Sequence, residues 1–407
     1  MHFIYDIKRM IERRKYINAI KPYIGKDLIK VLTGQRRVGK SMIIRLLSEE
    51  IKLNDKKANF IFIDKEDYEF DFIKTHKELD LYIKENTNSK QNNYLFIDEV
   101  QEIQGFELIL RSYNKKNNFD VYCTGSNAKI FSSELATYLS GRQIVFQIGS
   151  LNFMEFCLFH NLQNNQESLL KFIKYGGLPY LIHLPEDDSV RFEYLNNIFS
   201  TILMRDVVNR HQIRDPRFLS DLLKFIADNT GSLFSANKIA KYLKSQQITK
   251  NVSLILNYLS YLEDAYFINR VNRVDIQGKR NFEVGEKYYF EDIGLRNAII
   301  GFRMTDIAKI IENIVFLQLK NAGYKISIGY LQDKEIDFVA EKDNEKIYVQ
   351  VSYLLSDEKT IDREFGNLMK IKDNYPKYVV SFDSITAPNT YKGIIHLSLL
   401  EFLNQFK

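Results

Sequence analysis

The sequence predicts an α/β fold that begins with a parallel sheet covered by helices on both faces. Over the first 150 residues, short and nearly continuous apolar runs alternate with segments of helical periodicity. Such runs are typical of strands buried on both faces of a parallel sheet. No proline occurs between Pro22 and Pro179, so long elements are not interrupted there.

Five strands are expected in this first part of the chain. The first is followed at once by a helical pattern that carries Met42, Ile43 and Leu46. A polar stretch at 84–93 indicates a surface loop before the third strand. The expected strands cover residues 28–33, 59–64, 94–100, 121–124 and 144–148.

The middle of the chain is predicted to be helical and to contain a winged helix. Apolar residues recur at helical spacing over 218–228, after Ser235 and over 250–264. Two β-like runs follow, at 267–274 and 287–290. Three helices and a β-ribbon in this order are typical of a winged helix.

The last hundred residues predict a small α/β unit. The expected elements are a helix at 307–321, strands at 325–330, 336–340, 346–352 and 378–381, and a helix at 359–370. Four domains are expected: a P-loop core at 1–150, a helical lid or connector at 151–215, the winged helix at 216–300 and the final α/β domain at 301–407.

Composition excludes several classes of protein. The 57 basic and 52 acidic residues give a net charge of +5, which permits contact with nucleic acid without arguing for it. Two cysteines, with no CxxC or HxxxH spacing, exclude a disulfide scaffold and a structural zinc site. No run of 18 apolar residues and no signal-type N-terminus is present, so we expect a cytoplasmic protein without a membrane partner.

One segment matches a phosphate-binding pattern at every fixed position. Residues 34–41 fit G-x-x-x-x-G-K-[ST] between an expected strand and an expected helix. The glycines let the backbone wrap a phosphate chain, and the N–H groups at the helix start attract its charge. Lys40 is expected at the β- and γ-phosphates of ATP, and Ser41 at Mg²⁺. The expected cofactor-binding residues of this segment are Gly34, Gln35, Arg36, Arg37, Val38, Gly39, Lys40, Ser41 and Met42.

The third apolar run ends in two acids. Asp98 is expected to hold the Mg²⁺ hydration shell with Ser41, and Glu99 to orient and polarise the attacking water. A P-loop pattern alone arises by chance fairly often, but its joint occurrence with an apolar strand ending in Asp-Glu is much rarer. The two motifs together predict a nucleotide-binding site.

Two further positions complete the expected site. Ser126 or Asn127, at the end of the fourth run, is expected to sense the γ-phosphate, the alternative being a turn with an Asn cap. Arg142 is expected to neutralise phosphate charge in cis or in trans, the alternative being a solvated surface arginine. Glu99, Arg142 and Asn127 are therefore the candidate catalytic residues.

The order of these motifs resembles a large prokaryotic family, the AAA-type ATPases fused to a C-terminal domain of unknown function, DUF4143. The resemblance rests on the run 34–41 with its paired Arg36 and Arg37, on the Asp98-Glu99 pair, and on segments 124–126, 139–142, 150–156, 175–179, 205–208, 213–215 and 289–295. It covers nearly the whole chain. It implies an ATPase core, a helical lid, a winged helix and a restriction-endonuclease-like C-terminal domain, and it implies no particular substrate. It also implies that Pro179 lies near the nucleotide and couples its state to the following helices, the alternative being an ordinary helix-breaking loop.

DNA contact through the winged helix is one of two interpretations of that region. The third helix carries one cation against two acids, which makes a poor surface for phosphates. The expected wing is richer in cations, namely Arg270, Arg273, Lys279, Arg280 and Lys287. The alternative is a lid or subunit contact that moves during ATP hydrolysis; a homo-oligomer or a partner protein would then occupy it.

The C-terminal domain carries a degenerate form of an endonuclease-like pattern. Glu312 in a helix and Asp337 on a strand match that pattern, but Gln350 replaces the second acid and Ser352 replaces the lysine. Because Ser352 supplies no cation opposite the developing phosphate charge, we expect the fold to be kept and cleavage to be lost. The alternative for Glu312 and Asp337 is that each is a solvated or structural acid.

The sequence as a whole predicts an Mg²⁺-dependent ATPase. It is expected to bind ATP, release ADP and phosphate, and move the winged-helix and C-terminal domains during the cycle. Two alternatives stay open: a DNA-binding regulator gated by ATP, and an ATP-dependent nuclease.

Overall fold

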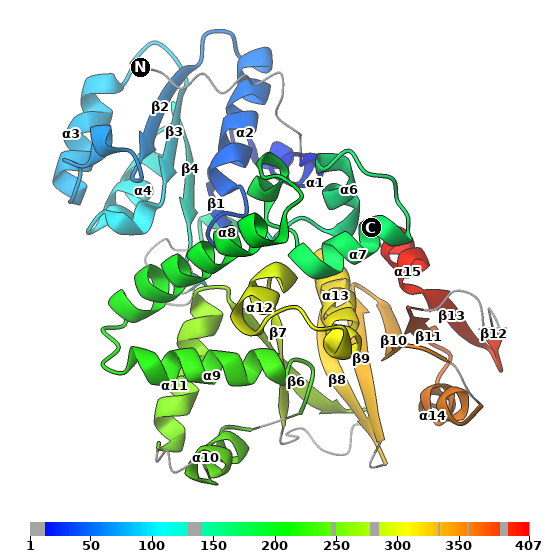
Figure 1. The fold of residues 1–407 in the computed structure, drawn as a ribbon. Helices are drawn as coiled ribbons and strands as arrows, with labels where there is room; N and C mark the ends of the chain where they lie inside the picture. The colour runs from blue at the N-terminus through cyan, green and yellow to red at the C-terminus, as the bar shows by residue number, and fades with distance from the viewer. Residues whose placement is uncertain are drawn as a thin grey trace. The chain divides into compact units, whose positions relative to one another are not determined.

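The computed structural model describes residues 13–128, 141–233, 235–245, 250–276, 285–332, 334–355, 358–382 and 390–406. These residues form two compact units (Figure 1). The first runs to Gly149 and includes the short segment Asp264–Tyr266; the second comprises Ser150–Glu263 and the chain from Phe267 onwards.

The first unit is built on a five-stranded parallel sheet, as the sequence predicts. The strands are β1 (Ile29–Thr33), β2 (Asn59–Asp64), β3 (Asn93–Asp98), β4 (Phe119–Gly125) and β5 (Gln143–Gln147). Their order is β2-β3-β4-β1-β5, and every neighbouring pair is parallel. The predicted strand ends are correct to within two residues. The carboxyl ends of all five strands therefore lie along one edge of the sheet.

Helices cover both faces of this sheet (Figure 1). They are α1 (Arg14–Ile20), α2 (Lys40–Asn54), α3 (His76–Asn86) and α4 (Phe106–Asn114). Strand residues alternate between the faces: Ile61 and Ile63 belong to the buried cluster with α3 and α4. Phe62 and Phe96 stack on the other face with ring centroids 4.7 Å apart. Both faces are thus apolar, which is why the strand sequences show no alternation of polar residues.

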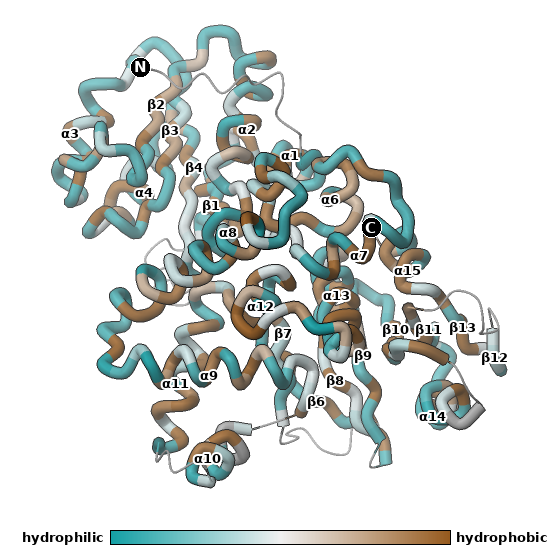
Figure 2. Tube along the Cα trace, viewed as in Figure 1, coloured by the Kyte–Doolittle hydropathy of each residue, from teal (hydrophilic) through white to brown (hydrophobic). Residues whose placement is uncertain are grey.

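The second unit begins with helices. They are α6 (Phe153–Phe159), α7 (Gln166–Tyr175), α8 (Asp188–Thr201) with a π-helical continuation at Ile202–Asn209, α9 (Pro216–Asp228), α10 (Ala236–Ser245), α11 (Val252–Asp264) and α12 (Ile293–Ile300). Teal and brown alternate along α9, as expected of a helix with one buried face (Figure 2). Within the described part of the chain, none of the helices combines the length and hydrophobicity needed to cross a bilayer.

An eight-stranded sheet carries the rest of the second unit. Its strands are β6 (Ile268–Asp275), β7 (Glu286–Phe290), β8 (Lys325–Leu331), β9 (Lys334–Lys342), β10 (Glu345–Ser352), β11 (Lys377–Ser381), β12 (Thr390–Tyr391) and β13 (Ile394–Ser398). The order is β12-β13-β11-β10-β9-β8-β6-β7. β6 and β7 form the expected antiparallel ribbon, but β6 also pairs parallel with β8. The ribbon is therefore continuous with the C-terminal sheet across residue 300.

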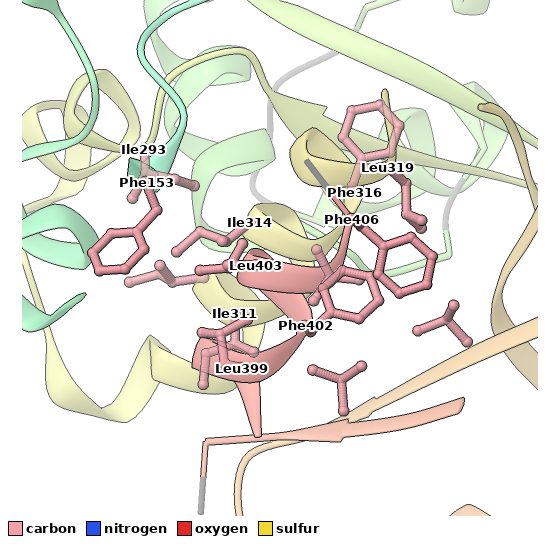
Figure 3. Packing of buried hydrophobic residues seen from close by; sticks show 14 of the residues in the cluster. Phe153, Ile293, Ile311, Ile314, Phe316, Leu319, Leu399, Phe402, Leu403 and Phe406 are labelled. Atoms are coloured by element: carbon pink, nitrogen blue, oxygen red, sulfur yellow. The ribbon is translucent and has the colours of Figure 1, made fainter. Parts of the chain in front are cut away.

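The core of this unit is made by helices from distant parts of the sequence (Figure 3). α13 (Ile307–Asn321) and the terminal α15 (Leu399–Gln405) meet α6 and α12 there, and α14 (Glu358–Met369) packs in a second cluster. Ser398 caps α15 reciprocally with Glu401, a capping box that fixes where this helix starts. The labelled core residues are Phe153, Ile293, Ile311, Ile314, Phe316, Leu319, Leu399, Phe402, Leu403 and Phe406.

Candidate active site

The loop between β1 and α2 has the backbone that a phosphate chain requires. Gly34 has φ 144°, and a Cβ there would lie 2.1 Å from the carbonyl oxygen of Ile148, so only glycine fits. Gly39 has φ 97° and directly precedes Lys40, the first residue of α2. The loop thus delivers its N–H groups and the start of α2 to one place, the carboxyl edge of the sheet.

Lys40 is turned inward over this loop. Its side chain is only 4% exposed, and its ammonium donates to the carbonyl oxygens of Gly34, at 3.0 Å, and Gln35, at 3.1 Å. The same ammonium lies 3.6 Å from a carboxylate oxygen of Glu99. The expected phosphate-binding cation and the expected catalytic base therefore face one another.

Asp98 and Ser41 also come together. Asp98 ends β3, is buried, and accepts hydrogen bonds from the hydroxyl groups of Ser41 and Thr124. Burial raises the pKa of Asp98 to about 6, and these two hydrogen bonds oppose the rise. A hydroxyl and a carboxylate side by side at a buried strand end are suitable ligands for a hydrated Mg²⁺, so the residues present fit this ion.

Glu99 experiences the opposite electrostatic environment. It has φ 51°, and its backbone N–H donates to the hydroxyl of Thr124 at 2.9 Å. Burial alone would raise its pKa, but the charges of Lys40 and Arg36 and a hydrogen bond from Gln101 lower the pKa to about 2. Two adjacent acids thus have pKa values moved apart, and Glu99 keeps its charge down to a lower pH than Asp98 does.

Two residues of this site are missed by the sequence motifs: Glu66 and Gln101. Glu66 pairs with the buried guanidinium of Arg36, which also lies 3.9 Å from Glu99. Gln101 donates to Glu99 and, at 3.2 Å, to Ser126. The signal that points to Glu66 is its position just beyond β2, because parallel strand ends share one edge of a sheet.

The remaining loop residues differ in their exposure. Arg37 is exposed and lies 3.9 Å from Glu66, while the Val38 side chain is fully buried. Met42 is half-buried. The amide nitrogen of Gln35 donates at 2.9 Å to the carbonyl oxygen of Tyr266, in the short segment that groups with this unit. The side chain of Gln35 is therefore engaged with the backbone of Tyr266, and the expected phosphate contact of Gln35 would come from its own backbone.

Asn127 and Ser126 follow β4 at the same edge of the sheet. Both are buried, and Ser126 also hydrogen-bonds Glu99. Because β4 lies between β3 and β1, both side chains emerge between the acidic pair and the phosphate loop. This is the place expected for a residue that senses the γ-phosphate.

Arg142 lies at the opposite edge. It directly precedes β5, and its carbonyl oxygen accepts from Ile29 N–H at 2.9 Å, where β1 begins. The phosphate loop follows the other end of β1, about 16 Å away at 3.3 Å per residue. An arginine side chain spans less than half of that, so the exposed Arg142 does not reach the site of its own chain.

The Gly-Gly-Leu-Pro loop belongs to the second unit. Gly177 N–H donates at 2.9 Å to the buried carboxylate of Asp292, and a Cβ on Gly176 would meet Gly294 N at 2.3 Å. Pro179 begins the 3₁₀ helix that follows. Two of the segments that carry the family resemblance are thus packed against each other.

The C-terminal acids are arranged differently from the sequence expectation. Lys287, expected on the wing as a DNA contact, is 2% exposed and lies among the carboxylates of Glu312, Glu335 and Asp337. The expectation that no cation replaces the missing lysine is therefore wrong. Motif spacing did not reveal this because Lys287 comes from β7, not from the strand of Gln350 and Ser352.

The side chain of Gln350 faces a backbone group. Its amide oxygen accepts from the N–H of Asp337 at 3.3 Å, and Ser352 donates to the carbonyl oxygen of Leu354 at 3.2 Å. Neither residue joins the group of acids around Lys287. Gln350 is thus bonded to the backbone of the strand that carries Asp337, whereas the carboxylates of Glu312 and Asp337 contact Lys287.

The other wing cations are also engaged where the structure describes them. Arg270 lies 3.5 Å from both Glu263 and Glu286. The Arg273 guanidinium lies over the ring of Tyr330, 3.8 Å from its centroid. Lys279 and Arg280 lie outside the described residues.

Comparison with protein families matches two successive segments of the chain. Residues 26–157 match a family model described as an AAA domain. Residues 166–306 match a model described as a domain of unknown function, DUF8612, a different designation from the DUF4143 of the resemblance. The phosphate loop and the acidic pair lie within the AAA match.

Two relatives match almost the full length. The chain is 33% identical over 380 residues to an uncharacterized protein of Haemophilus influenzae, an alignment that covers 92% of this chain and 94% of that protein. It is 31% identical to the uncharacterized protein MJ1544 of Methanocaldococcus jannaschii, over 91% and 85% of the two chains. Among solved structures, the Saccharomyces cerevisiae Hsp104-ADP complex matches 62% of this chain and 39% of that one, with 15% identity and a TM-score of 0.33, too low to carry an argument.

Proposed function

The chain belongs to the protein family that includes these Haemophilus influenzae and Methanocaldococcus jannaschii relatives and carries an AAA domain, and on that basis we propose that it binds ATP and hydrolyses it to ADP and phosphate with Mg²⁺. The observation that carries the proposal is the meeting of Lys40, Asp98 and Glu99 at the carboxyl edge of one parallel sheet. These three side chains supply the phosphate cation, the metal ligand and the base of ATP hydrolysis.

Binding of the phosphate chain is assigned to the loop 34–39 and the start of α2. Its N–H groups and the helix dipole attract the negative charge, and glycine at 34 leaves room for the backbone to approach. Lys40 exchanges its two carbonyl acceptors for phosphate oxygens. Ser41 and Asp98 would hold Mg²⁺, which neutralises charge on the transferred phosphoryl group.

Activation of water is assigned to Glu99. Its low pKa keeps it ionised at neutral pH, so it accepts a hydrogen bond from the attacking water and orients it. Arg36 and Gln101 hold the carboxylate in place. Ser126 and Asn127 are positioned to respond to the γ-phosphate, because they emerge between Glu99 and the loop.

Coupling of the nucleotide to the rest of the chain is proposed through Gln35. This loop residue is fully buried and hydrogen-bonds the carbonyl oxygen of Tyr266, two residues before β6 begins. A change in the loop on nucleotide binding would therefore reach the first strand of the ribbon. Pro179 is proposed as a second coupling point on the family resemblance.

Arg142 is proposed to act in trans. Arg142 is exposed and directly precedes β5, at the end of the strand away from the phosphate loop, so its side chain does not reach the active site of its own chain. An arginine that stabilises transferred phosphate from a neighbouring subunit is a recurring device in ATP hydrolysis. This proposal requires a homo-oligomer.

DNA binding and nuclease activity receive less support. The described cations of the expected wing are paired with acids or stacked on a ring, which leaves Lys279 and Arg280 as the residues to test. We therefore propose that the second unit serves as a lid or contact surface moved by the ATPase cycle.

The decisive experiment is steady-state ATP hydrolysis by the purified chain. Phosphate release should require Mg²⁺ and should be unchanged by duplex DNA. Release without Mg²⁺, or none under any condition despite ATP binding, would contradict the proposal. Stimulation by DNA that declines with added salt would favour the DNA-binding alternative.

A further inference from the structure

One buried guanidinium stands between two carboxylates of the candidate active site. Arg36 belongs to the phosphate loop, and its side chain is 3% exposed. Its Nη1 atom donates a hydrogen bond to Oε1 of Glu66, whereas its Nη2 atom lies 3.9 Å from Oε2 of Glu99. Glu66 lies just beyond β2 and Glu99 just beyond β3, and these strands are parallel neighbours. The sheet therefore brings both acids to the same arginine.

The two acids differ in their exposure and in their distance from this arginine. The Glu66 side chain is 34% exposed, and that of Glu99 is 7% exposed. The direct partner of the buried guanidinium is thus the more exposed acid. Because a charge-assisted hydrogen bond between a guanidinium and a carboxylate takes about 2.7–2.9 Å, a shift of about 1 Å would bring Arg36 onto Glu99.

Such a shift would use up the acceptor positions of Glu99. Its Oε2 atom already accepts from the amide of Gln101, and its Oε1 atom faces the Lys40 ammonium at 3.6 Å. Since a carboxylate oxygen offers about two lone-pair positions, a bonded Arg36 would fill Oε2 completely. A carboxylate held in this way is a weaker base and has less room to accept from water.

We propose that Glu66 is a positioning residue of the ATPase site: it holds Arg36 away from Glu99 and so leaves the base free to accept from the attacking water. The inference rests on the proposed function, because it concerns the residue assigned to water activation. Since Glu66 acts through Arg36, losing Glu66 alone should lower turnover more than losing both residues together. An ion pair that only stabilises the fold would not produce this order.

Turnover at saturating ATP and Mg²⁺ tests the order directly. Glu66→Gln keeps the shape of the side chain and removes its charge, Arg36→Gln removes the guanidinium, and the double variant removes both. Glu66→Gln should lower turnover by roughly tenfold or more and leave KM within a few-fold of the wild type, because the released Arg36 closes onto the base. The double variant should turn over several-fold faster than Glu66→Gln. Glu69→Gln, which alters an exposed acid in the same segment after β2, is the matched control and should behave as the wild type.

Thermal unfolding without nucleotide detects the same rearrangement independently of catalysis. Glu99→Gln should lower the Tm by about 3 °C more in the Glu66→Gln background than in the wild-type background, because it then breaks a charge-assisted hydrogen bond to Arg36. The Glu69→Gln background should show no such increase. This comparison can be made even on a chain that hydrolyses no ATP, so failure of the proposed function and failure of this inference are distinguishable.

Three results would overturn the proposal. In a chain that hydrolyses ATP, wild-type turnover by Glu66→Gln would mean that Glu66 has no influence on the base. A double variant no faster than Glu66→Gln would mean that the effect does not pass through Arg36. An equal Tm change for Glu99→Gln in the Glu66→Gln and wild-type backgrounds would mean that Arg36 does not move to Glu99 when Glu66 is lost.

Discussion

The ammonium of Lys40 lies 3.6 Å from the carboxylate of Glu99. One residue begins α2 and the other follows β3, so the parallel sheet brings a cation and a base together from positions 59 residues apart. Because the same ammonium contributes to the low pKa of Glu99, the two residues form one electrostatic unit. Substituting Lys40 should therefore affect the binding of ATP, whereas substituting Glu99 should affect its hydrolysis.

Lys40→Ala should weaken ATP binding by roughly 10- to 100-fold, because it removes a charge-assisted hydrogen bond to the phosphates. Binding of a fluorescent ATP analogue measures this effect. Lys52→Ala is the matched control, since Lys52 lies on the same helix in an exposed pair with Glu49. Equal affinity of Lys40→Ala and the control would contradict the assignment of Lys40.

Arg142→Ala should lower turnover by roughly a thousandfold while changing ATP affinity little, as expected of a group used mainly in the transition state. Because Arg142 is too far from the active site of its own chain, turnover per chain of the wild type should fall on dilution. Mixing the Arg142→Ala variant with the Glu99→Gln variant should restore part of the activity, because each supplies the residue that the other lacks. Arg111→Ala, an exposed arginine on α4, is the control. Wild-type turnover by Arg142→Ala at every concentration would leave Arg142 a solvated surface residue.

The purified chain should not cut DNA. Lys287 fills the position among Glu312, Glu335 and Asp337, so these acids are engaged in an internal charge pair instead of holding a metal. The assay is incubation of supercoiled and linear DNA with Mg²⁺ or Mn²⁺ and ATP. Nicking by the wild type that disappears in Asp337→Asn would refute this prediction and favour the nuclease alternative.

The stability of the second unit should depend on pH through Asp337. Burial and the charge of Glu312 raise its pKa to about 8, against the opposing effect of Lys287. The folded state therefore holds this proton more tightly than the unfolded state, and the free energy of unfolding falls as pH rises from about 4 to 8. Asp337→Asn should thus gain stability relative to the wild type between pH 5 and pH 8 in urea unfolding.

Asp221→Asn, an exposed substitution on α9, should leave the pH profile nearly unchanged. The charged and titratable neighbours that face Asp337 are Lys287, Glu312, Glu335 and Tyr289, and none of them is altered in either variant. If the two variants show the same profile as the wild type, Asp337 is already ionised throughout this range.

The sequence predicts the first unit well because its signals are local. Each strand of the parallel sheet is a short apolar run, and Gly34, Lys40 and Asp98 lie in motifs whose spacing is fixed by backbone geometry. Glu66 escapes detection because its role depends only on the end of β2 lying beside the end of β3. No spacing rule links it to Arg36.

The second unit is predicted less well because the residues around Lys287 come from positions that are far apart in the sequence. Lys287 and Glu312 are brought together by the pairing of β6 with β8, which no periodicity reveals. A lysine in a half-polar β-ribbon is normally solvent-exposed, so composition favoured a surface role. The helix α15 was missed because it is short and lies at the end of the chain, although its Ser398–Glu401 capping box is a recognisable start signal.

The most direct test of the account is the Mg²⁺-dependent turnover of Glu99→Gln against its affinity for ATP. The substitution keeps the shape of the side chain and leaves Asp98 in place, but it removes the ionised base that Lys40 and Arg36 hold. ATP binding should stay within a few-fold of the wild type, while phosphate release should fall by roughly a hundredfold or more. Wild-type phosphate release by Glu99→Gln would contradict the assignment of Glu99 as the residue that activates water.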